Sequence, residues 1–239
     1  MKIGLLGYGK MGKAIEAVAM EQQLEIVFRI TRANAGDMTP EILRTADVVI
    51  EFTRPESAFG HVMACLQAGV PVVSGTTGCL DNLPEAEAFC RAQHGALLWT
   101  SNFSIGVNLF FALNRYLSGL MDRRPEYQPA LTEIHHIHKL DAPSGTALTL
   151  VKDILARLEG KNGWTLSPTP PGPKDIPIHA IREGEVPGTH IVTWTSGVDE
   201  IRLEHTAHSR LGFAAGAVLA ARWIAGKEGV FTMNEVLGI

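Results

Sequence analysis

The sequence has no excess of basic residues and little charge of either sign. Asp, Glu, Lys and Arg make up 19% of the 239 residues, below the roughly 25% of an average soluble protein. The 21 Lys and Arg residues are outnumbered by 25 Asp and Glu residues, which gives a formal net charge of -4. Non-specific binding to a phosphate backbone needs a basic excess, so we expect no nucleic-acid partner.

Long apolar runs and paired cysteines are also missing. The longest uncharged apolar stretch covers residues 211–221, well short of the ~20 residues that span a bilayer, and no signal peptide is visible. Cys65, Cys79 and Cys90 are odd in number and widely spaced, which suits neither a disulfide framework nor a zinc knuckle. We expect reduced thiols in a cytoplasmic protein that does not enter a membrane.

What the chain does contain, through about its first hundred residues, is an alternation of short apolar runs with amphipathic stretches. Strands are predicted over residues 2–6, 25–30, 47–52, 70–74 and 96–100, with helices over 11–22 and about 82–93. Pro55 falls where the first turn of a further helix tolerates proline. This pattern is typical of an α/β fold, and predicts a Rossmann-type doubly wound parallel sheet.

The pattern changes after residue 106. A helix is predicted over 107–121, an alternating run over 129–139, and a helix from about Ser144. Alternating runs at 189–195 and 200–206 are joined by a hairpin turn. A segment with four prolines, residues 161–174, is interpreted as a lid or an oligomer contact. These elements predict a second, α+β domain with a mixed or antiparallel sheet.

The last predicted helix, over residues 211–225, has an alanine-rich face that suits close packing on the first domain. We therefore expect a discontinuous dinucleotide-binding domain, residues 1–106 and 211–239. Residues 107–210 would form the domain for substrate binding and oligomerisation.

A glycine loop between the first strand and the first helix fits the pattern G-x-G-x-x-G. Gly7 would allow the tight turn, Gly9 would let the backbone approach a pyrophosphate, and Gly12 would permit close packing of helix on strand. The helix N-terminus supplies N–H groups for that anion. A plain glycine turn is the alternative. The predicted cofactor-binding residues here are Gly7, Tyr8, Gly9, Lys10, Met11 and Gly12.

The segment after the second strand lacks the carboxylate that usually holds the ribose of NAD, since neither Asp nor Glu occurs between Glu25 and Asp37. Arg32, together with Arg29 or Thr31, would instead suit a 2′-phosphate, because a guanidinium group offers forked donors. We predict NADPH as the preferred cofactor, with NADH tolerated. The alternative is that Arg32 is a solvated loop residue.

Two further loops follow predicted strands at their carboxyl ends, where open α/β sheets bind ligands. A plain turn would look the same as the first of them. The residues predicted to line the nicotinamide half of the cofactor are Gly75, Thr76, Thr77, Thr100, Ser101, Asn102 and Phe103.

Three histidines crowd into residues 135–138, just before Lys139. A zinc site is one interpretation, but an extended chain points His135 away from His136 and His138, so we predict no metal. A structural cluster is a second. The third is a proton-donating and anion-binding site, in which His and Lys supply positive charge and residues 144–146 supply N–H groups at a helix start.

With the run EIHHIHKLDAPSGTA at residues 133–147, the sequence resembles the dihydrodipicolinate reductase family of bacterial and plant lysine biosynthesis. The likeness extends along the chain. It includes the glycine loop, GTTG at 75–78, NFSIGVN at 102–108, REGEVPGTH at 182–190 and SRLGFAAGA at 209–217. Thr31 stands where the family usually has an acid, and the chain is short for the family.

The resemblance implies reduction of 4-hydroxy-tetrahydrodipicolinate, a cyclic imine dicarboxylate, by NAD(P)H with loss of water, in diaminopimelate and lysine biosynthesis. It also implies a homotetramer, and burial of the second sheet in that assembly would fit the low charge. Among site residues it implies an acid pair and carboxylate binders: His135 and Lys139 for the first, and His136, Ser144, Gly145 and Thr146 for the second.

Hydride addition leaves negative charge on the substrate framework, and a nearby acid must quench it. Lys139 is the preferred donor, because its stem can reach the ring and a protonated His135 beside it would make its ammonium group a stronger acid. Two other hypotheses stay open: a nucleotide sensor without catalysis, and a metal-dependent hydrolase built on the histidines.

Overall fold

The computed structural model describes residues 1–78, 82–209 and 211–239. The chain forms two compact units, the first made of Met1–Ile105 with Leu211–Ile239 and the second of Gly106–Arg210. Within the described parts of the chain, none of the helices has the length and apolar character needed to cross a membrane. The expected thiol of Cys79 and the motif residue Arg210 lie outside the described residues.

The first unit is built on a parallel sheet whose strand order is β11-β5-β4-β3-β1-β2. All five strands predicted for its N-terminal part are present: the first two have the predicted bounds, and the other three are shorter by one or two residues. The sixth, β11, was not predicted. The strands are β1 Lys2–Leu6, β2 Glu25–Ile30, β3 Val48–Glu51, β4 Val72–Ser74, β5 Ala96–Trp99 and β11 Gly229–Phe231.

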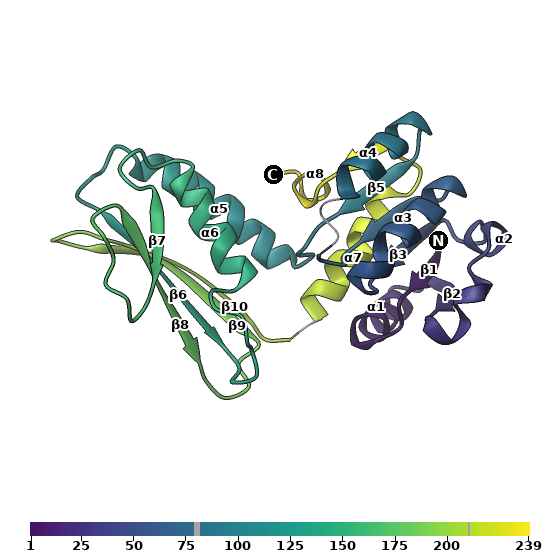
Figure 1. The fold of residues 1–239 in the computed structure, drawn as a ribbon, viewed down its shortest axis with the longest axis horizontal. Coiled ribbons are helices and arrows are strands. Elements are labelled where there is room, and N and C mark those ends of the chain that lie inside the picture. The colour runs from purple at the N-terminus through teal and green to yellow at the C-terminus, as the bar shows by residue number, and fades with distance from the viewer. Residues whose placement is uncertain (79–81, 210) are drawn as a thin grey trace. The chain divides into compact units, whose positions relative to one another are not determined.

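Helices cover both faces of this sheet, which confirms the doubly wound fold. The α1, α7 and α8 helices share one apolar core with the sheet, and α3 and α4 share a second core on its other face (Figure 1). Strands buried on both faces read as near-continuous apolar runs, which is why they were recognisable. The helices are α1 Lys10–Glu21, η1 Arg32–Asp37, α2 Pro40–Leu43, α3 Pro55–Gln67, α4 Leu83–Ala92, α7 Leu211–Ile224 and α8 Met233–Leu237.

The alanine-rich face of α7 packs closely on the first unit, as predicted. Ala214, Ala217 and Ala220 are fully buried there. Gly216 lies so near the main chain that a Cβ atom built on it would overlap the carbonyl oxygen of Phe103. The approach of this helix therefore depends on a residue without a side chain.

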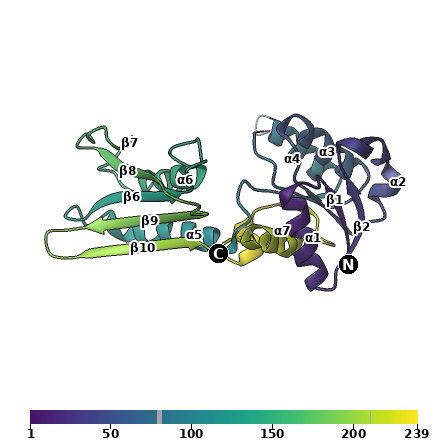
Figure 2. The ribbon, with the colours of Figure 1, turned by 90° about the horizontal axis from the view of Figure 1, so that it is seen from below.

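The second unit holds a mixed sheet with the order β10-β9-β6-β8-β7 (Figure 2). The β9 strand pairs antiparallel with both β10 and β6, whereas β8 runs parallel to β6 and β7. The α5 and α6 helices pack on one face of this sheet. The elements are α5 Ile105–Met121, β6 Gln128–His135, α6 Gly145–Leu155, β7 Gly163–Leu166, β8 Asp175–Arg182, β9 Gly188–Thr195 and β10 Glu200–Ala207.

Two strands of this sheet were not predicted from the sequence. The proline-rich segment, interpreted as a lid or an oligomer contact, contains β7, and β8 follows it. Pro177 lies inside β8, and a proline normally argues against a paired strand. It is tolerated here because β8 pairs with β6 only from Ile178 onward. The strand predicted over 129–139 ends earlier, at His135.

We predict that Gly216→Ala will lower the free energy of unfolding by about 3 kcal/mol, at the upper end of the usual cost of overpacking, because the new methyl group meets a main-chain oxygen. Denaturant titration measures this. The control is Gly119→Ala, since Gly119 is in α5 and a Cβ atom there would meet no described neighbour within 4 Å; it should raise stability by roughly 0.5 to 1 kcal/mol. Equal effects of the two changes would contradict the proposed close approach.

Candidate functional site

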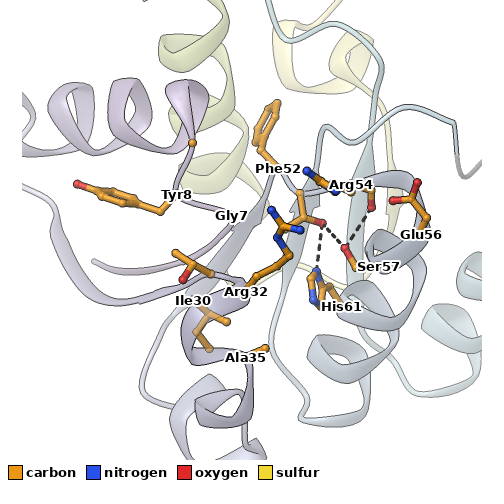
Figure 3. Close-up of a pocket in the computed structure, with 13 residues that line it drawn as sticks. Gly7, Tyr8, Ile30, Arg32, Ala35, Phe52, Arg54, Glu56, Ser57 and His61 are labelled. Atoms are coloured by element: carbon orange, nitrogen blue, oxygen red, sulfur yellow. Dashed lines mark hydrogen bonds between the residues drawn. The ribbon is translucent and has the colours of Figure 1, made fainter.

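A cavity of about 730 Å³ lies at the carboxyl ends of β1, β2 and β3 (Figure 3). The chain runs from β1 outward to β2 and then returns to β3 on the other side of β1. Open α/β sheets bind ligands at such a reversal of strand order, and a cavity of this size suits a ligand of moderate size. The lining residues are Gly7, Tyr8, Gly9, Ile30, Thr31, Arg32, Ala35, Phe52, Thr53, Arg54, Glu56, Ser57 and His61.

The three glycines of the loop have the geometry that their motif predicts. Gly7 has a φ of +92°, a left-handed conformation that favours glycine, and Gly12 approaches so closely that a Cβ atom there would overlap the carbonyl oxygen of Gly7. Gly9 faces open space: no described atom lies within 4 Å of where its Cβ would be. It precedes α1 without a side-chain cap. The loop therefore leaves backbone N–H groups available to an anion such as a pyrophosphate.

The structure brings only part of the predicted cofactor residues to this cavity. Gly7, Tyr8, Gly9, Thr31 and Arg32 line it. The others follow strands at the same edge of the sheet or begin a helix: Lys10, Met11 and Gly12 form the first turn of α1, Gly75, Thr76 and Thr77 follow β4, and Thr100, Ser101, Asn102 and Phe103 follow β5.

Among the candidates for a 2′-phosphate, Arg32 is the one whose side chain extends into the cavity (Figure 3). Arg29 instead forms an ion pair with Glu16, which also accepts a hydrogen bond from the hydroxyl of Tyr8. The hydroxyl of Thr31 caps η1 and donates to Asn34 Oδ1 at 2.8 Å. The local contacts therefore favour Arg32.

Sequence reasoning missed the residues that the loop after β3 and the first turns of α3 contribute to the cavity. Phe52, Thr53, Arg54, Ser57 and His61 all line it. Thr53 Oγ1 lies 3.2 Å from Nδ1 of His61 and accepts a hydrogen bond from Ser57 (Figure 3). A usable signal was present, because a segment that follows a buried parallel strand belongs to the ligand-binding edge.

Behind the cavity, the carboxylate of Glu51 is fully buried. Its oxygens accept hydrogen bonds from the hydroxyls of Ser74 at 2.6 Å, Thr76 at 2.8 Å, and Thr53. Burial alone would raise the pKa of Glu51, but these bonds and the contact with His61 outweigh it and hold the pKa below its usual value. The hydroxyl of Thr76, predicted to face the cofactor, therefore positions this loop.

In the second unit, the register of the sheet assembles a different cluster at the end of β6. Glu133 and His135 are two residues apart on one strand, so their side chains share a face. His190 on β9 lies directly opposite Glu133, and Arg182 on β8 lies opposite His135. The start of α6 adds Ser144. His135 and Ser144 were predicted from the sequence as site residues, whereas the other three had no predicted role.

Glu133 is the centre of this cluster and is fully buried. Its Oε1 accepts a hydrogen bond from the Arg182 guanidinium at 2.9 Å, and its Oε2 accepts one from the backbone N–H of Ser144 at 2.9 Å. Burial alone would raise the pKa of Glu133, but the bonds from Ser144 and Arg182 hold it below its usual value. The cluster therefore contains a fixed negative charge.

The two buried imidazoles lie beside each other on the same face of the neighbouring strands β6 and β9. Nε2 of His135 lies 3.4 Å from Nε2 of His190, which lies 3.0 Å from the hydroxyl oxygen of Ser144. Burial lowers the pKa of His190 to about 4, helped by the neighbouring His135. Burial also lowers the pKa of His135; Lys139 and Arg182 act in the same direction, and Glu133 opposes them.

Lys139 forms an ion pair that was not predicted from the sequence. Its Nζ donates to both carboxylate oxygens of Asp141 at 2.8 Å, and Lys139 lowers the pKa of that carboxyl. Burial disfavours the protonated form of His135 that was expected beside Lys139, and Glu133 favours it. Lys139 is instead oriented by a carboxylate two residues away.

The predicted carboxylate binders lie at the start of α6 and in the turn before it. Ser144 is the N-cap of α6, and its Oγ accepts a hydrogen bond from the backbone N–H of Ala147 at 3.2 Å. Gly145 and Thr146 form the first helical turn, which presents N–H groups to an anion. The Nδ1 atom of His136 is buried without a hydrogen-bond partner among the described residues. These groups could hold a carboxylate.

The sequence suggested a possible metal site at the three histidines of residues 135–138. Among the described residues, the group that could hold an ion is a different one. Ligand atoms of Glu133, His135 and His190 lie within 4.8 Å of one another, whereas His136 and His138 belong to a separate pair with rings 5.9 Å apart. A cation at the first set would lie near the Arg182 guanidinium, which is 2.9 Å from the Glu133 carboxylate. That fixed positive charge disfavours a divalent ion.

Comparison with protein families gives two matches. Residues 1–103 match the family described as dihydrodipicolinate reductase, N-terminus, and residues 106–237 match that described as dihydrodipicolinate reductase, C-terminus. Together they cover nearly the whole chain, and the boundary between them falls where the first unit gives way to the second.

Curated relatives agree with these matches. The chain is 45% identical to a 4-hydroxy-tetrahydrodipicolinate reductase of Christiangramia forsetii, over 99% of this chain and 98% of that protein. It is 40% identical to the enzyme of the same name from Chromobacterium violaceum, over 81% of this chain and 74% of the relative.

Among solved structures, the chain resembles a dipicolinate-bound dihydrodipicolinate reductase from Paenisporosarcina sp. TG-14. The TM-score is 0.79 with 23% sequence identity, over 98% of each chain. This likeness confirms the fold.

We predict that stability will fall as the pH drops from about 6.5 toward 4. His190 is neutral in the folded protein, with a pKa of about 4, but takes up a proton near pH 6.5 when unfolded. The unfolded state therefore binds more protons across this window, at a cost on the order of 3 kcal/mol. His190→Asn should flatten the pH dependence of the unfolding free energy. The control, His94→Asn, changes a highly exposed histidine and should leave it intact; equal slopes for all three proteins would contradict the prediction.

Proposed function

Because this chain belongs to the dihydrodipicolinate reductase family, we propose that it reduces 4-hydroxy-tetrahydrodipicolinate to tetrahydrodipicolinate with loss of water. It is an NAD(P)H-dependent oxidoreductase of diaminopimelate and lysine biosynthesis. The observation that carries the proposal is 45% identity to a named reductase along 99% of the chain. We assign the cofactor to the glycine-loop cavity of the first unit, and the substrate to the acids and the start of α6 in the second unit.

The first unit would hold the cofactor, which supplies the hydride when bound. The glycine loop and the start of α1 would bind its pyrophosphate, and Arg32 its adenosine half. The loops after β4 and β5 would line its nicotinamide half, as the family resemblance implies. Hydride chemistry belongs to the cofactor, so the protein's task is to orient it and to place charge.

The second unit would bind the substrate and supply the proton. One carboxylate would be held by the N–H groups at the start of α6, Ser144, Gly145 and Thr146, and by His136. His135 and Lys139 would be the acids that quench the charge left by hydride addition. The ion pair with Asp141 positions the Lys139 ammonium group for this role.

We propose NADPH as the preferred cofactor, with NADH accepted. The cavity contains two guanidinium groups, Arg32 and Arg54, and β2 ends without a carboxylate. A 2′-phosphate would be attracted by both cations, whereas the unmodified ribose of NADH would gain little from them.

A cytoplasmic homotetramer is the proposed assembly. Helices cover one face of the second sheet, while the opposite face includes the apolar side chains of Ala130, Ile134 and Ile181, the last of which is 42% exposed, among polar ones such as Thr132. A sheet face of this composition is suited to packing against another copy of the chain.

Two other functions are less well supported. A metal-dependent hydrolase would have to place its ion beside Arg182, as described above. A nucleotide sensor would have no use for His135, Lys139 and an anion-binding helix start together.

Purified protein should oxidise NADPH when given freshly synthesised 4-hydroxy-tetrahydrodipicolinate, followed by loss of reduced-nicotinamide absorbance. His135→Gln and Lys139→Ala should each lower kcat by roughly 10²-fold or more, the usual scale of general acid catalysis. The controls, His94→Gln and Lys174→Ala, change exposed residues and should be fully active. No turnover with either cofactor would overturn the proposed function, and full activity of the first two variants would remove the acid assignment.

Arg32→Ala should raise the KM for NADPH by about tenfold or more and change the KM for NADH less than twofold. The reason is that a hydrogen bond to a charged group contributes roughly 1.5 to 3 kcal/mol, and only NADPH carries the phosphate. Arg29→Ala is the matched control, since its guanidinium is already paired with Glu16. An unchanged KM for NADPH in the Arg32 variant would show that this arginine is a solvated loop residue.

A further inference from the structure

His135 is surrounded by groups that the proposed reaction has not yet used. Its Nε2 lies 3.4 Å from Nε2 of His190 and 3.9 Å from Oε2 of Glu133, and Nε2 of His190 lies 3.8 Å from the same oxygen. All three residues are at most 8% exposed. Both rings are therefore largely, though not completely, removed from solvent, and they lie close to a fixed negative charge.

We propose that Glu133 and His190 are positioning residues that act through His135. The Glu133 carboxylate stabilises the imidazolium form of His135, and His190 provides the hydrogen-bond partner that fixes the direction of its Nε2. The inference rests on the reductase function proposed above and deepens it, because it adds the groups that make a buried histidine usable as an acid.

The positions of these groups are set by the backbone of a sheet. Glu133 and His135 share a face of β6, and the antiparallel neighbour β9 places His190 directly opposite Glu133. Functional groups carried by strands are held more precisely than groups on loops. The distances between the carboxylate and the two rings therefore follow from strand register.

Glu133 is itself held from two sides, with a different task for each oxygen. Oε1 pairs with the Arg182 guanidinium, and Oε2 accepts the backbone N–H of Ser144 and faces both imidazoles. The carboxylate cannot rotate without losing these bonds. Its Oε2 therefore stays directed at Nε2 of His135, the atom that would carry the proton.

The charges that face His135 show why a carboxylate is needed. Arg182 from β8 and Lys139 from the following turn both disfavour a second positive charge, as does burial, and His205 from β10 acts in the same way on His190. Glu133 from β6 favours the imidazolium, and so does a hydrogen bond with the backbone of Pro187. Removing the charge of Glu133 would leave only that hydrogen bond against burial and the two cations.

A second observation shows that the ring position is constrained. Gly188, the first residue of β9, lies against His135: a Cβ atom there would stand 2.9 Å from Cε1 of the ring. Because the residue at this point is a glycine, the imidazole can lie directly against the backbone of β9. His135 is thus held between Gly188 and the pair formed by Glu133 and His190.

The proton balance is simple. When the imidazolium gives its proton to the reduced substrate, its N–H bond breaks and a bond to hydrogen forms on the substrate. The ring is left neutral and facing His190, and solvent returns one proton to His135 before the next turnover. Glu133 stays ionised throughout.

The test is Glu133→Gln, which keeps the shape of the side chain and removes its charge. Histidine NMR titration of the whole protein, with the His135 signal assigned from His135→Gln, should show the pKa of His135 lowered by about one unit or more. The alkaline limb of the kcat profile should move to lower pH by the same amount, while the KM for NADPH stays within twofold. An unchanged His135 titration and an unchanged pH profile in a folded Glu133→Gln variant would overturn the proposal.

Two further variants keep the outcome decisive. Glu133→Asp retains the charge and should restore much of the pH profile, whereas Glu126→Gln changes an exposed glutamate and should have no effect. If Glu133→Gln does not fold, His190→Gln decides: a tenfold or greater fall in kcat at constant KM for NADPH supports the proposal, and wild-type kcat overturns it. The NMR titration needs no substrate, so an inactive wild-type protein would refute the reductase function separately.

Discussion

Each unit of the protein is organised around one carboxylate that is removed from water. Burying an ionised carboxylate costs several kcal/mol unless hydrogen bonds and opposite charge replace its hydration. Glu51 meets this constraint by drawing hydroxyls from β4 and its following loop, and Glu133 by drawing Arg182 and the start of α6. Both carboxylates thereby fix the loops at the carboxyl ends of their strands, which are the segments proposed to contact cofactor and substrate.

The overall charge of the protein hides these local fields. A net charge of -4 argues against nucleic acid, yet Arg32 and Arg54 line the cavity of the first unit, and Lys139 and Arg182 flank the cluster of the second. Local positive charge beside low-dielectric walls attracts small anions regardless of the net charge. A phosphorylated dinucleotide and a dicarboxylate are both such anions.

The parallel sheet was predictable from the sequence, because buried strands read as apolar runs. The glycine loop and the histidine segment were predictable because each is a short motif whose residues are close together in the chain. The cluster around Glu133 was not predictable in this way. Two of its members, His135 and His190, lie 55 residues apart in the chain, and only the strand register brings them together. β8 was missed because Pro177 concealed it. Asp141 is the instructive case, since it stands two residues from Lys139 and could have been recognised as its partner.

The return of the chain to its first unit has a consequence for synthesis on the ribosome. The α7 helix and β11, which complete that unit, are translated only after the roughly one hundred residues of the second unit. At about 5 to 20 residues per second, the nascent first sheet waits roughly 5 to 20 s for its covering helix. During that interval the apolar face that includes Ile3, Leu5 and Ile50 lacks α7, and apolar surface exposed in this way is prone to aggregate.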